Sequence, residues 1–151
     1  MTGVSVREVA AATCPELSAE LAAAGLPVDD LGEPGRRFFR FAGADGERIG
    51  FVGAEAAGNA VLLRSLVVVP PCRGKGWGAR ILGWAEAAMA AEGFVEAYAL
   101  TTTIAPLLAR WGWERIERAE APPAIRDSRQ FAGLCPASAV LMRHPLTPQA
   151  S

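Results

Sequence analysis

The sequence predicts one α/β domain in which a mixed, mostly antiparallel sheet is flanked by helices. The chain has 151 residues, a usual size for one domain, and 51% of them are hydrophobic, which suits a single buried core. Short runs rich in valine, phenylalanine and leucine indicate strands, and segments with apolar residues at helical spacing lie between them. Three consecutive strand-like runs are joined by tight turns, as in an antiparallel meander.

The first third of the chain predicts a strand followed by a helix. Residues 5–10 alternate weakly between polar and apolar side chains, and residues 14–25 carry leucines at helical spacing. Thr13 and Glu16 have the spacing of a capping box in front of this helix. Gly25 is expected to end it.

The meander occupies the middle of the chain, with strands expected over 37–43, 48–55 and 60–69. The intervening turns read "ADGE" and "AAGN", which are hairpin residues. Apolar residues then recur at helical spacing over 78–92, so a long helix should run to Gly93.

Short helices and strands alternate in the last third. The expected elements are a strand over 94–101, a helix over 104–112, a strand over 113–119, a turn and helix over 122–134, and a strand over 137–144. The tail from about residue 145 should be loose. No linker or internal repeat divides the chain, so one domain is expected over residues 1–151.

Charge and composition exclude several classes of partner. Fifteen basic and sixteen acidic residues leave a formal net charge of −1, which lacks the basic excess of a nucleic-acid-binding protein. No apolar run approaches the ~20 residues of a membrane span, and no signal peptide is evident, so we expect a cytoplasmic protein with no membrane partner. The three cysteines are widely spaced, which favours free thiols over a disulfide framework or a metal site.

The segment "PPCRGKGWGARIL" carries the strongest functional signal, because a strand leads through glycines into a helix. Such a turn gathers backbone N–H groups at a positive helix end, where an anion such as pyrophosphate binds. Gly74, Gly76 and Ala79 fit a relaxed dinucleotide fingerprint, but the next strand ends in "LTTT" without the acidic residue this motif needs. A phosphate-binding GK[ST] loop is absent from the sequence. A turn that merely connects strand and helix is the alternative.

Arg73, Gly76 and Gly78 spell R-x-x-G-x-G directly after a V-x-P turn at 68–70, and this resembles the acyl-coenzyme A signature of the GNAT family of N-acetyltransferases. The order of elements is also similar to that family's, and "LLARWGWERI" at 107–116 looks like its later LYxxLGF segment. The resemblance implies the GNAT (acyl-CoA N-acyltransferase) fold and acetyl-CoA as cosubstrate.

The resemblance covers most of the chain from about residue 36 and implies direct acetyl transfer through a tetrahedral intermediate, without an acyl-enzyme. The turn would cradle the pyrophosphate, and the end of the preceding strand would bind pantetheine and hold the thioester carbonyl. The cofactor-binding residues it implies are Leu66, Val67, Val68, Arg73, Gly74, Lys75, Gly76, Trp77 and Gly78. Trp77 points either into the core or over the cofactor, and Cys72 is not needed as a nucleophile.

The general acid and base are less clear. The tyrosine that serves as general acid in this family aligns with Leu108, and the only tyrosine, Tyr98, lies inside an expected strand. The thiolate would then leave with a proton from water or without help. Glu55, at the end of a meander strand, is the candidate general base through a water, the alternative being a solvated surface glutamate. His144 is expected at the surface near a fraying end.

Arg64 and Ser65 stand inside an otherwise apolar strand and are candidate acceptor-binding residues. A buried guanidinium is costly unless paired, and its partner is either a substrate carboxylate or an internal acid such as Glu55 or an aspartate. Residues 128–142, with "LRSL" and "LTTT", look like a GNAT subgroup often encoded beside arsenic-resistance genes, and in part like N-acetylglutamate synthase-type enzymes. Further candidates at the acceptor pocket are Arg126, Ser128, Arg129, Cys135 and Ser138.

The sequence therefore predicts an acetyl-CoA-dependent N-acetyltransferase that acts on the primary amine of a small, amino-acid-like molecule. The resemblance adds a link to arsenic resistance and, because many relatives are dimers, a homodimer. Two alternatives stay open: a catalytically weak coenzyme A-binding or sensing protein, and a peptide or protein N-terminal acetyltransferase. Thioester consumption with amino acids, binding without turnover, and turnover only with peptides would distinguish them.

Overall fold

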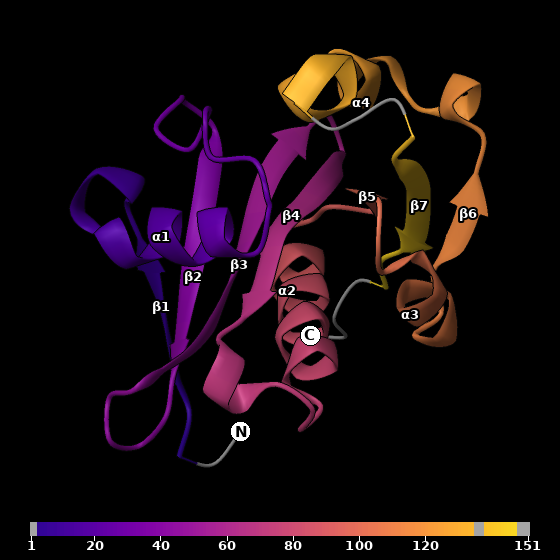
Figure 1. Cartoon of the computed structure of the whole chain (residues 1–151). Coiled ribbons are helices and arrows are strands. Elements are labelled where there is room, and N and C mark those ends of the chain that lie inside the picture. The colour runs from indigo at the N-terminus through magenta and orange to yellow at the C-terminus, as the bar shows by residue number, and fades with distance from the viewer. Residues whose placement is uncertain (1–2, 135–137, 148–151) are drawn as a thin grey trace. The chain divides into compact units, whose positions relative to one another are not determined.

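The computed structural model describes residues 3–134 and 138–147 (Figure 1). The order of elements follows the sequence-based expectation. They are β1 (Ser5–Val9), α1 (Pro15–Ala23), β2 (Arg36–Ala42), β3 (Arg48–Ala57), β4 (Ala60–Val68), α2 (Trp77–Ala91), β5 (Glu96–Thr101), α3 (Ala105–Arg110), β6 (Glu114–Ile116), α4 (Pro123–Arg126) and β7 (Val140–Pro145). In the described part of the chain, no helix is long and apolar enough to cross a membrane.

The described strands form a mixed seven-stranded sheet in the order β1-β2-β3-β4-β5-β7-β6. β4 pairs with β5 in parallel, whereas the β1–β2, β2–β3, β5–β7 and β6–β7 pairs are antiparallel. The α/β fold class expected from the sequence, a mostly antiparallel sheet with flanking helices, is confirmed.

The chain divides into two compact units. Residues 1–55 and 64–85 form the first unit, and residues 56–63 and 86–151 form the second. The boundaries fall inside β3, β4 and α2, so no linker marks them in the sequence.

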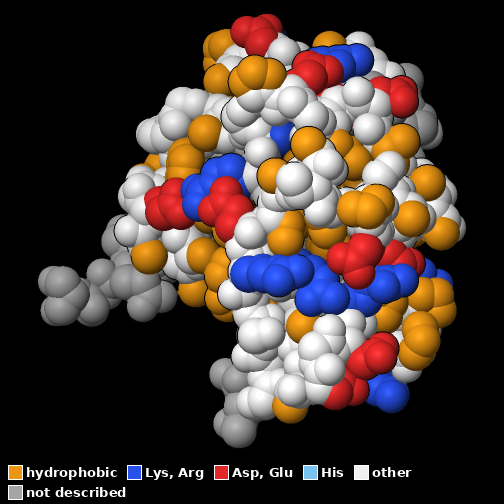
Figure 2. Space-filling model, turned by 90° about the vertical axis from the view of Figure 1, so that its left-hand side faces the viewer, with side chains coloured by type: hydrophobic (Ala, Val, Ile, Leu, Met, Phe, Trp, Pro, Cys, Tyr) orange, Lys and Arg blue, Asp and Glu red, His pale blue; other side chains and the backbone are white. Residues whose placement is uncertain are grey.

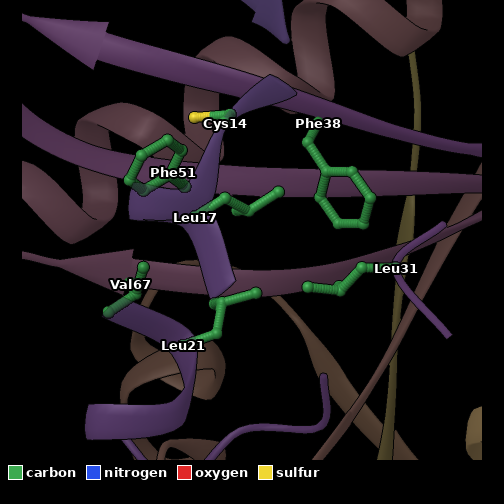
Figure 3. Close-up of a cluster of buried hydrophobic side chains, with 7 residues drawn as sticks. All are labelled: Cys14, Leu17, Leu21, Leu31, Phe38, Phe51 and Val67. Carbon is green, nitrogen blue, oxygen red and sulfur yellow. The ribbon is translucent and has the colours of Figure 1, made fainter. Parts of the chain in front are cut away.

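In the first unit, β2 presents its aromatic side chains alternately to two helices. Phe38 belongs to a buried cluster with α1 (Figure 3), whose members are Cys14, Leu17, Leu21, Leu31, Phe38, Phe51 and Val67. Phe39 and Phe41 point to the opposite face, where Trp84 of α2 meets their rings edge-on at centroid distances of 5.0 and 5.3 Å. Each large apolar side chain buried in this way stabilises the fold by about 1.5–3 kcal/mol.

The outer surface of the first unit carries several ion pairs. Arg37 pairs with Glu8, and Arg48 of β3 reaches Glu16 and Glu20 of α1 at 3.1 and 2.8 Å. Basic and acidic side chains accordingly lie side by side on the face drawn in Figure 2. Pairs as exposed as these contribute little stability individually.

The second unit has its own buried cluster, formed by Ala57, Ala60, Leu62, Tyr98, Ala121, Ile125 and Leu141. On β7, His144 stacks on Trp113 with ring centroids 5.4 Å apart. Both rings contact the Glu86 carboxylate of α2, the imidazole at 3.1 Å and the indole N–H at 3.2 Å. His144 therefore lies within an ordered strand, and the expectation of a fraying end at this residue was wrong.

Two further local expectations need correction. The capping box at Thr13 and Glu16 does not form: Thr13 lies in a short 3-10 turn, where its hydroxyl donates to the Ala10 carbonyl. Pro15 occupies the first turn of α1 and fixes its start, so Cys14 is the N-cap. The strand expected over 113–119 is confined to β6, because Glu117 and Glu120 form a real capping box that turns the chain.

The C-terminal segment is ordered beyond the expected start of a loose tail. β7 continues to Pro145, and the buried Leu146 donates its backbone N–H to the Val95 carbonyl at 2.9 Å. Residues 148–151 lie outside the described residues.

Candidate coenzyme A and acceptor site

The backbone of β4 is distorted at Ser65. Its φ of 58° lies in the left-handed region, and no other non-glycine residue in the described chain has a positive φ. This conformation costs an L-residue about 1–2 kcal/mol. Strain of this kind clusters at functional sites. Here it immediately precedes Leu66–Val68, the segment expected to bind pantetheine.

Two glycines of β3 allow β4 to approach closely. A Cβ on Gly50 would lie 2.3 Å from the Val67 carbonyl oxygen, and one on Gly53 would lie 3.1 Å from Cγ of Arg64 and 2.8 Å from the Phe38 ring. A side chain at Gly50 would displace the β4 backbone, and one at Gly53 would displace the Phe38 ring and the stem of Arg64. The sequence analysis missed both glycines, although glycine inside an apolar strand is itself a signal of close backbone approach.

The glycine turn follows β4 through the 3-10 turn Pro70–Cys72. Gly74 and Gly76 have φ of 77° and 83°, and nothing lies within 4 Å of where a Cβ would stand on either. The N–H of Arg80 donates to the Gly76 carbonyl at 3.3 Å, at the start of α2. The preceding N–H groups have no intrahelical acceptor, as at any helix N-terminus. The turn is therefore open and lined by donors, as an anion site requires.

The side chains of the turn have separate roles. Arg73 donates Nε–H to the Val68 carbonyl at 2.9 Å, which ties the turn to the end of β4, and Lys75 is exposed. Trp77 is half-buried, and the Arg80 guanidinium lies 5.0 Å above its ring. Of the two expected orientations of Trp77, full burial in the core is therefore not observed. Cys72 is a half-buried free thiol.

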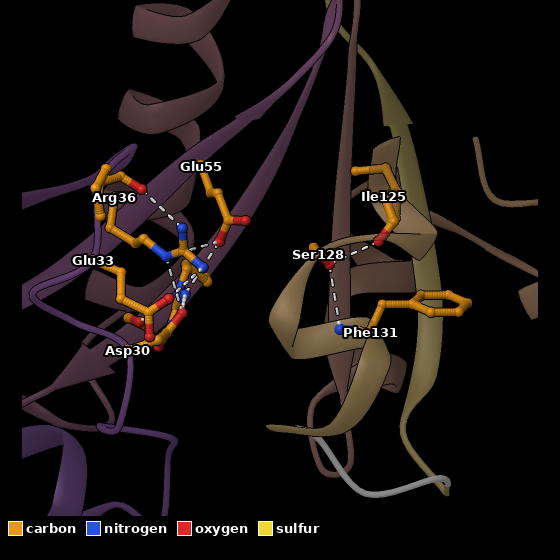
Figure 4. A network of polar contacts seen from close by, with 10 residues as sticks. Asp30, Glu33, Arg36, Glu55, Ile125, Ser128 and Phe131 are labelled. Atoms are coloured by element: carbon orange, nitrogen blue, oxygen red, sulfur yellow. Dashed lines mark hydrogen bonds and ion pairs between the residues drawn. The ribbon is translucent and has the colours of Figure 1, made fainter. Parts of the chain in front are cut away.

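A cluster of charged side chains surrounds the buried Arg64. Its members Asp30, Glu33, Arg36 and Glu55 are labelled in Figure 4. Nη1 and Nη2 of Arg64 each donate to one oxygen of Asp30 at 2.6 Å, and the side chains of both residues are fully buried. Nη1 also donates to Glu55 at 3.2 Å, and Arg36 Nε donates to Asp30 at 3.1 Å. The guanidinium groups of Arg64 and Arg36 thus face the carboxylates of Asp30 and Glu55, and Arg36 also pairs with the more exposed Glu33 at 3.8 Å. Of the two kinds of partner expected for Arg64, the structure shows internal acids, Asp30 and Glu55. Because Nη1 and Nη2 already donate to these carboxylates, the alternative of a substrate carboxylate as the partner of Arg64 is corrected.

The charge of Asp30 is stabilised by its partners. Burial alone raises the pKa of Asp30, but the hydrogen bonds and positive charges of Arg64 and Arg36 outweigh it and hold this pKa below its usual value. Asp30 was not singled out in the sequence analysis. The cost of an unpaired guanidinium implied only that Arg64 needs a partner, with Glu55 or an aspartate as the internal candidates. The structure shows that this aspartate lies 34 residues before Arg64 in the chain.

Glu55, the candidate base, is largely buried and uses one carboxylate oxygen to contact the guanidinium groups. Oε1 lies 3.2 Å from Arg64 Nη1 and 3.7 Å from Arg36 Nε. Oε2 points away from them in Figure 4, and no contact of it is found among the described residues. One oxygen is therefore held in place and the other is available.

The remaining candidate acceptor-binding residues belong to the second unit. Ser128 is buried and uses its hydroxyl locally, donating to the Ile125 carbonyl at 2.7 Å and accepting from the Phe131 N–H. Arg126, at the end of α4, and Ser138 are exposed. Cys135 lies outside the described residues. The hydroxyl of Ser128 therefore stabilises the turn after α4.

The two positions relevant to a general acid are both buried. Leu108 of α3 is apolar and almost inaccessible, so it supplies no proton. Tyr98 of β5 is also buried, with its hydroxyl 3.5 Å from the Glu96 carboxylate. The pKa of this phenol is raised mainly by burial and, to a smaller extent, by the negative charge of Glu96.

Comparisons with known proteins agree with this geometry. The profile of the acetyltransferase (GNAT) family matches residues 7–112, and the chain belongs to this family. The expected fold class is confirmed, and the acetyltransferases of this family use acetyl-CoA as acyl donor, in agreement with the enzyme class and cosubstrate that the resemblance implied. No curated protein matches the sequence.

Several solved structures share the fold. N-acetylglutamate synthase from Neisseria gonorrhoeae, complexed with coenzyme A and N-acetyl-glutamate, is 19% identical with a TM-score of 0.78, covering 97% of this chain and 36% of that one. A GNAT acetyltransferase from Staphylococcus aureus is 14% identical with a TM-score of 0.71, covering 95% and 99%. Nourseothricin acetyltransferase is 21% identical with a TM-score of 0.65, covering 97% and 100%. The chain thus spans only 36% of the length of the synthase.

Proposed function

We propose that this protein transfers the acetyl group of acetyl-CoA to the primary amine of a small, amino-acid-like molecule. The observation that carries the proposal is the open, donor-lined glycine turn between β4 and α2, with Gly74 and Gly76 in left-handed conformations. The backbone N–H groups of Arg73 to Gly78 bind the pyrophosphate, and Leu66, Val67 and Val68 bind pantetheine. Lys75 adds positive charge, and Trp77 flanks the turn.

The chemistry needs few protein groups. Glu55 takes a proton from the acceptor's ammonium through a water, and the free amine attacks the thioester carbon. The C–N bond forms in a tetrahedral intermediate, and the nitrogen releases its second proton to solvent. The C–S bond then breaks, and the departing thiolate takes up a proton from solvent. This assignment is supported by the unused Oε2 of Glu55 and by the apolar character of Leu108.

The acceptor class is proposed from the similarity to a structure with a bound amino-acid derivative. Likeness to a synthase bound to N-acetyl-glutamate favours an amino-acid-like acceptor, for which Arg126 and Ser138 are the exposed candidate contacts. Ser65 borders the strand end where the acceptor would meet the thioester. The arsenic-resistance resemblance adds amino-acid-like arsenicals to the acceptors worth testing. A homodimer is checked by sedimentation of the purified protein.

The direct test is calorimetric titration with acetyl-CoA, followed by a free-thiol assay with amino acids, amino-acid-like arsenicals and peptides. Binding with thiol release for an amino acid or an arsenical supports the proposal and identifies the acceptor class. Release only with peptides favours an N-terminal acetyltransferase. Binding without release favours a sensing protein, and no binding contradicts the assigned turn.

A matched substitution tests the turn itself. Gly76→Asp together with Gly78→Asp introduces negative charge where the pyrophosphate is proposed to lie, and should abolish acetyl-CoA binding while circular dichroism stays native-like. Gly83→Asp adds a carboxylate at an exposed position of the same helix, with nothing within 4 Å, and should bind normally. Unchanged affinity in the folded double variant would contradict the proposal.

A further inference from the structure

We propose that Asp30 and Arg64 are positioning residues that hold Ser65 in its left-handed conformation and so orient the β4 backbone toward the thioester carbonyl. This inference rests on the proposed function, because it concerns the thioester end of the same β4 segment. It assigns the buried charge cluster a role in the reaction that does not require contact with substrate.

Ser65 needs a restraint because serine does not favour the left-handed region. Its φ of 58° is the only positive value at a non-glycine residue in the described chain. If φ relaxed to an extended value, the peptide between Ser65 and Leu66 would rotate, and the backbone groups of the following residues would point elsewhere. The direction of the donor groups in Leu66–Val68 therefore depends on this single dihedral angle.

Arg64 supplies the restraint. Its Nε–H donates to Oγ of Ser65 at 3.2 Å within the buried interior. The guanidinium and this hydroxyl lie on opposite sides of the N–Cα bond of Ser65, the bond about which φ rotates. A hydrogen bond that spans this bond resists its rotation, provided that the guanidinium itself is fixed.

Asp30 fixes the guanidinium. It pairs end-on with Nη1 and Nη2, each at 2.6 Å, and this geometry leaves Nε free to reach Ser65. Gly53 leaves room for the Arg64 stem, since a Cβ there would lie 3.1 Å from Cγ of Arg64. Hydrogen bonds therefore connect Asp30, in the loop before β2, through Arg64 to Ser65, the distorted residue of β4.

Glu55 and Arg36 balance the charges of the buried Arg64–Asp30 pair. Glu55 lies 3.2 Å from Arg64 Nη1, and Arg36 Nε lies 3.1 Å from Asp30. Glu33 pairs with Arg36 at the exposed side of the cluster, so every buried charge in it has an opposite charge beside it. Breaking the Arg64–Asp30 pair would by itself destabilise the fold, because it leaves a buried charge without a partner. The bond to Ser65 is the one contact of Arg64 whose consequence lies in backbone direction, and it separates a positioning role from a purely structural one.

The test uses the full-length protein with [1-13C]acetyl-CoA, whose carbonyl resonance reports polarisation of the thioester. Arg64→Lys keeps the charge but loses the planar fork, and should move the bound carbonyl signal toward that of free acetyl-CoA. It should also lower the preference for acetyl-CoA over coenzyme A by about fivefold, the effect of losing the restraint on one left-handed residue. Asp30→Asn should act in the same direction. Arg37→Lys, in an exposed ion pair of β2, is the matched control.

Ser65→Gly provides the decisive variant, because glycine adopts a positive φ without a side-chain restraint. In the Arg64→Lys background, it should restore most of the carbonyl shift even though the lost stability does not return. Failure of Ser65→Gly to restore the shift, or an unshifted carbonyl in Arg64→Lys, would overturn the positioning role. Absence of acetyl-CoA binding by the unmodified protein would instead contradict the proposed function.

Discussion

At the scale of single residues, the charge buried at Asp30 is the least expected feature of this protein. A fully buried carboxylate is tolerated because Arg64 and Arg36 supply hydrogen bonds and opposite charge from two strands. Removing one partner leaves another charge buried without compensation. Stability should therefore depend on the ionised form of Asp30.

Asp30→Asn should lower the free energy of unfolding at neutral pH by about 3 kcal/mol, the usual cost of breaking a buried ion pair. Because the folded pKa of Asp30 lies below its unfolded value of 3.8, its contribution is complete above that pH and is lost as the pH falls through the folded pKa. Urea unfolding of both proteins at decreasing pH should show the difference shrinking in acid. Asp29→Asn, at the exposed neighbouring residue, should change little, and a pH-independent difference would refute the explanation.

At the scale of elements, close packing of β3 on β4 depends on the absence of a side chain. Gly50 leaves the Val67 carbonyl and Ile81 of α2 the space that a methyl group would occupy. This couples the position of the segment proposed to bind pantetheine, Leu66–Val68, to β3 and α2. Replacement of glycine by alanine should thus lower the stability of the protein at Gly50 and raise it at Gly83.

Gly50→Ala should destabilise the protein by about 3 kcal/mol, since a Cβ 2.3 Å from a backbone oxygen forces β4 to move. It should also weaken acetyl-CoA binding. Gly83→Ala, in the interior of α2 with nothing within 4 Å, should stabilise it by about 0.5–1 kcal/mol. Thermal unfolding and titration calorimetry measure both effects. Equal stabilities for the two variants would show that β3 and β4 can separate at little cost.

Glu86 makes a second contact between elements, within the second unit. Glu86→Ala removes the acceptor shared by the Trp113 indole and the His144 imidazole, and should cost about 2 kcal/mol because a buried indole N–H loses its partner. Glu114→Ala removes an exposed partner of Arg143 and should cost less than about 1 kcal/mol. Chemical unfolding monitored by tryptophan fluorescence compares them, and similar losses would indicate that Glu86 acts only as a surface charge.

At the scale of the whole molecule, the proposed acetyl transfer has to proceed without the tyrosine common in this family. Leu108 occupies that position and is buried, and Tyr98 lies within β5. A thiolate is a tolerable leaving group at neutral pH, so the transfer does not require a protein acid.

Tyr98→Phe should therefore leave kcat within about twofold of the unmodified enzyme, because general acid catalysis typically contributes a hundredfold or more. Burial and Glu96 raise the pKa of Tyr98, so its phenol stays neutral at assay pH. A thiol-release assay across pH measures the rate, with Glu55→Gln as the variant that should lose activity. A large fall in kcat for a folded Tyr98→Phe protein would assign the acid to Tyr98 after all.

Local signals predicted most of the fold. Gly93 ends α2 and Gly25 follows α1, both with positive φ, and the hairpin glycines stand where the meander turns. The start of α1 was misplaced because the Thr13 and Glu16 pattern competes with Pro15, and the sequence does not show which of them wins. The turn of the candidate site was predictable for the same reason as the hairpins, since its conformation is encoded by adjacent residues.

The sequence by itself determined the order of elements, the glycine turn and the missing tyrosine, because each is a property of residues close together in the chain. Only the tertiary structure decided that Arg64 pairs with Asp30, 34 residues earlier in the chain, and that Ser65 has a positive φ. It also decided that the absence of a side chain at Gly53 leaves room for the stem of Arg64. A buried charge requires some partner, which composition can indicate. Which partner it finds depends on the distances that folding creates between strands and loops.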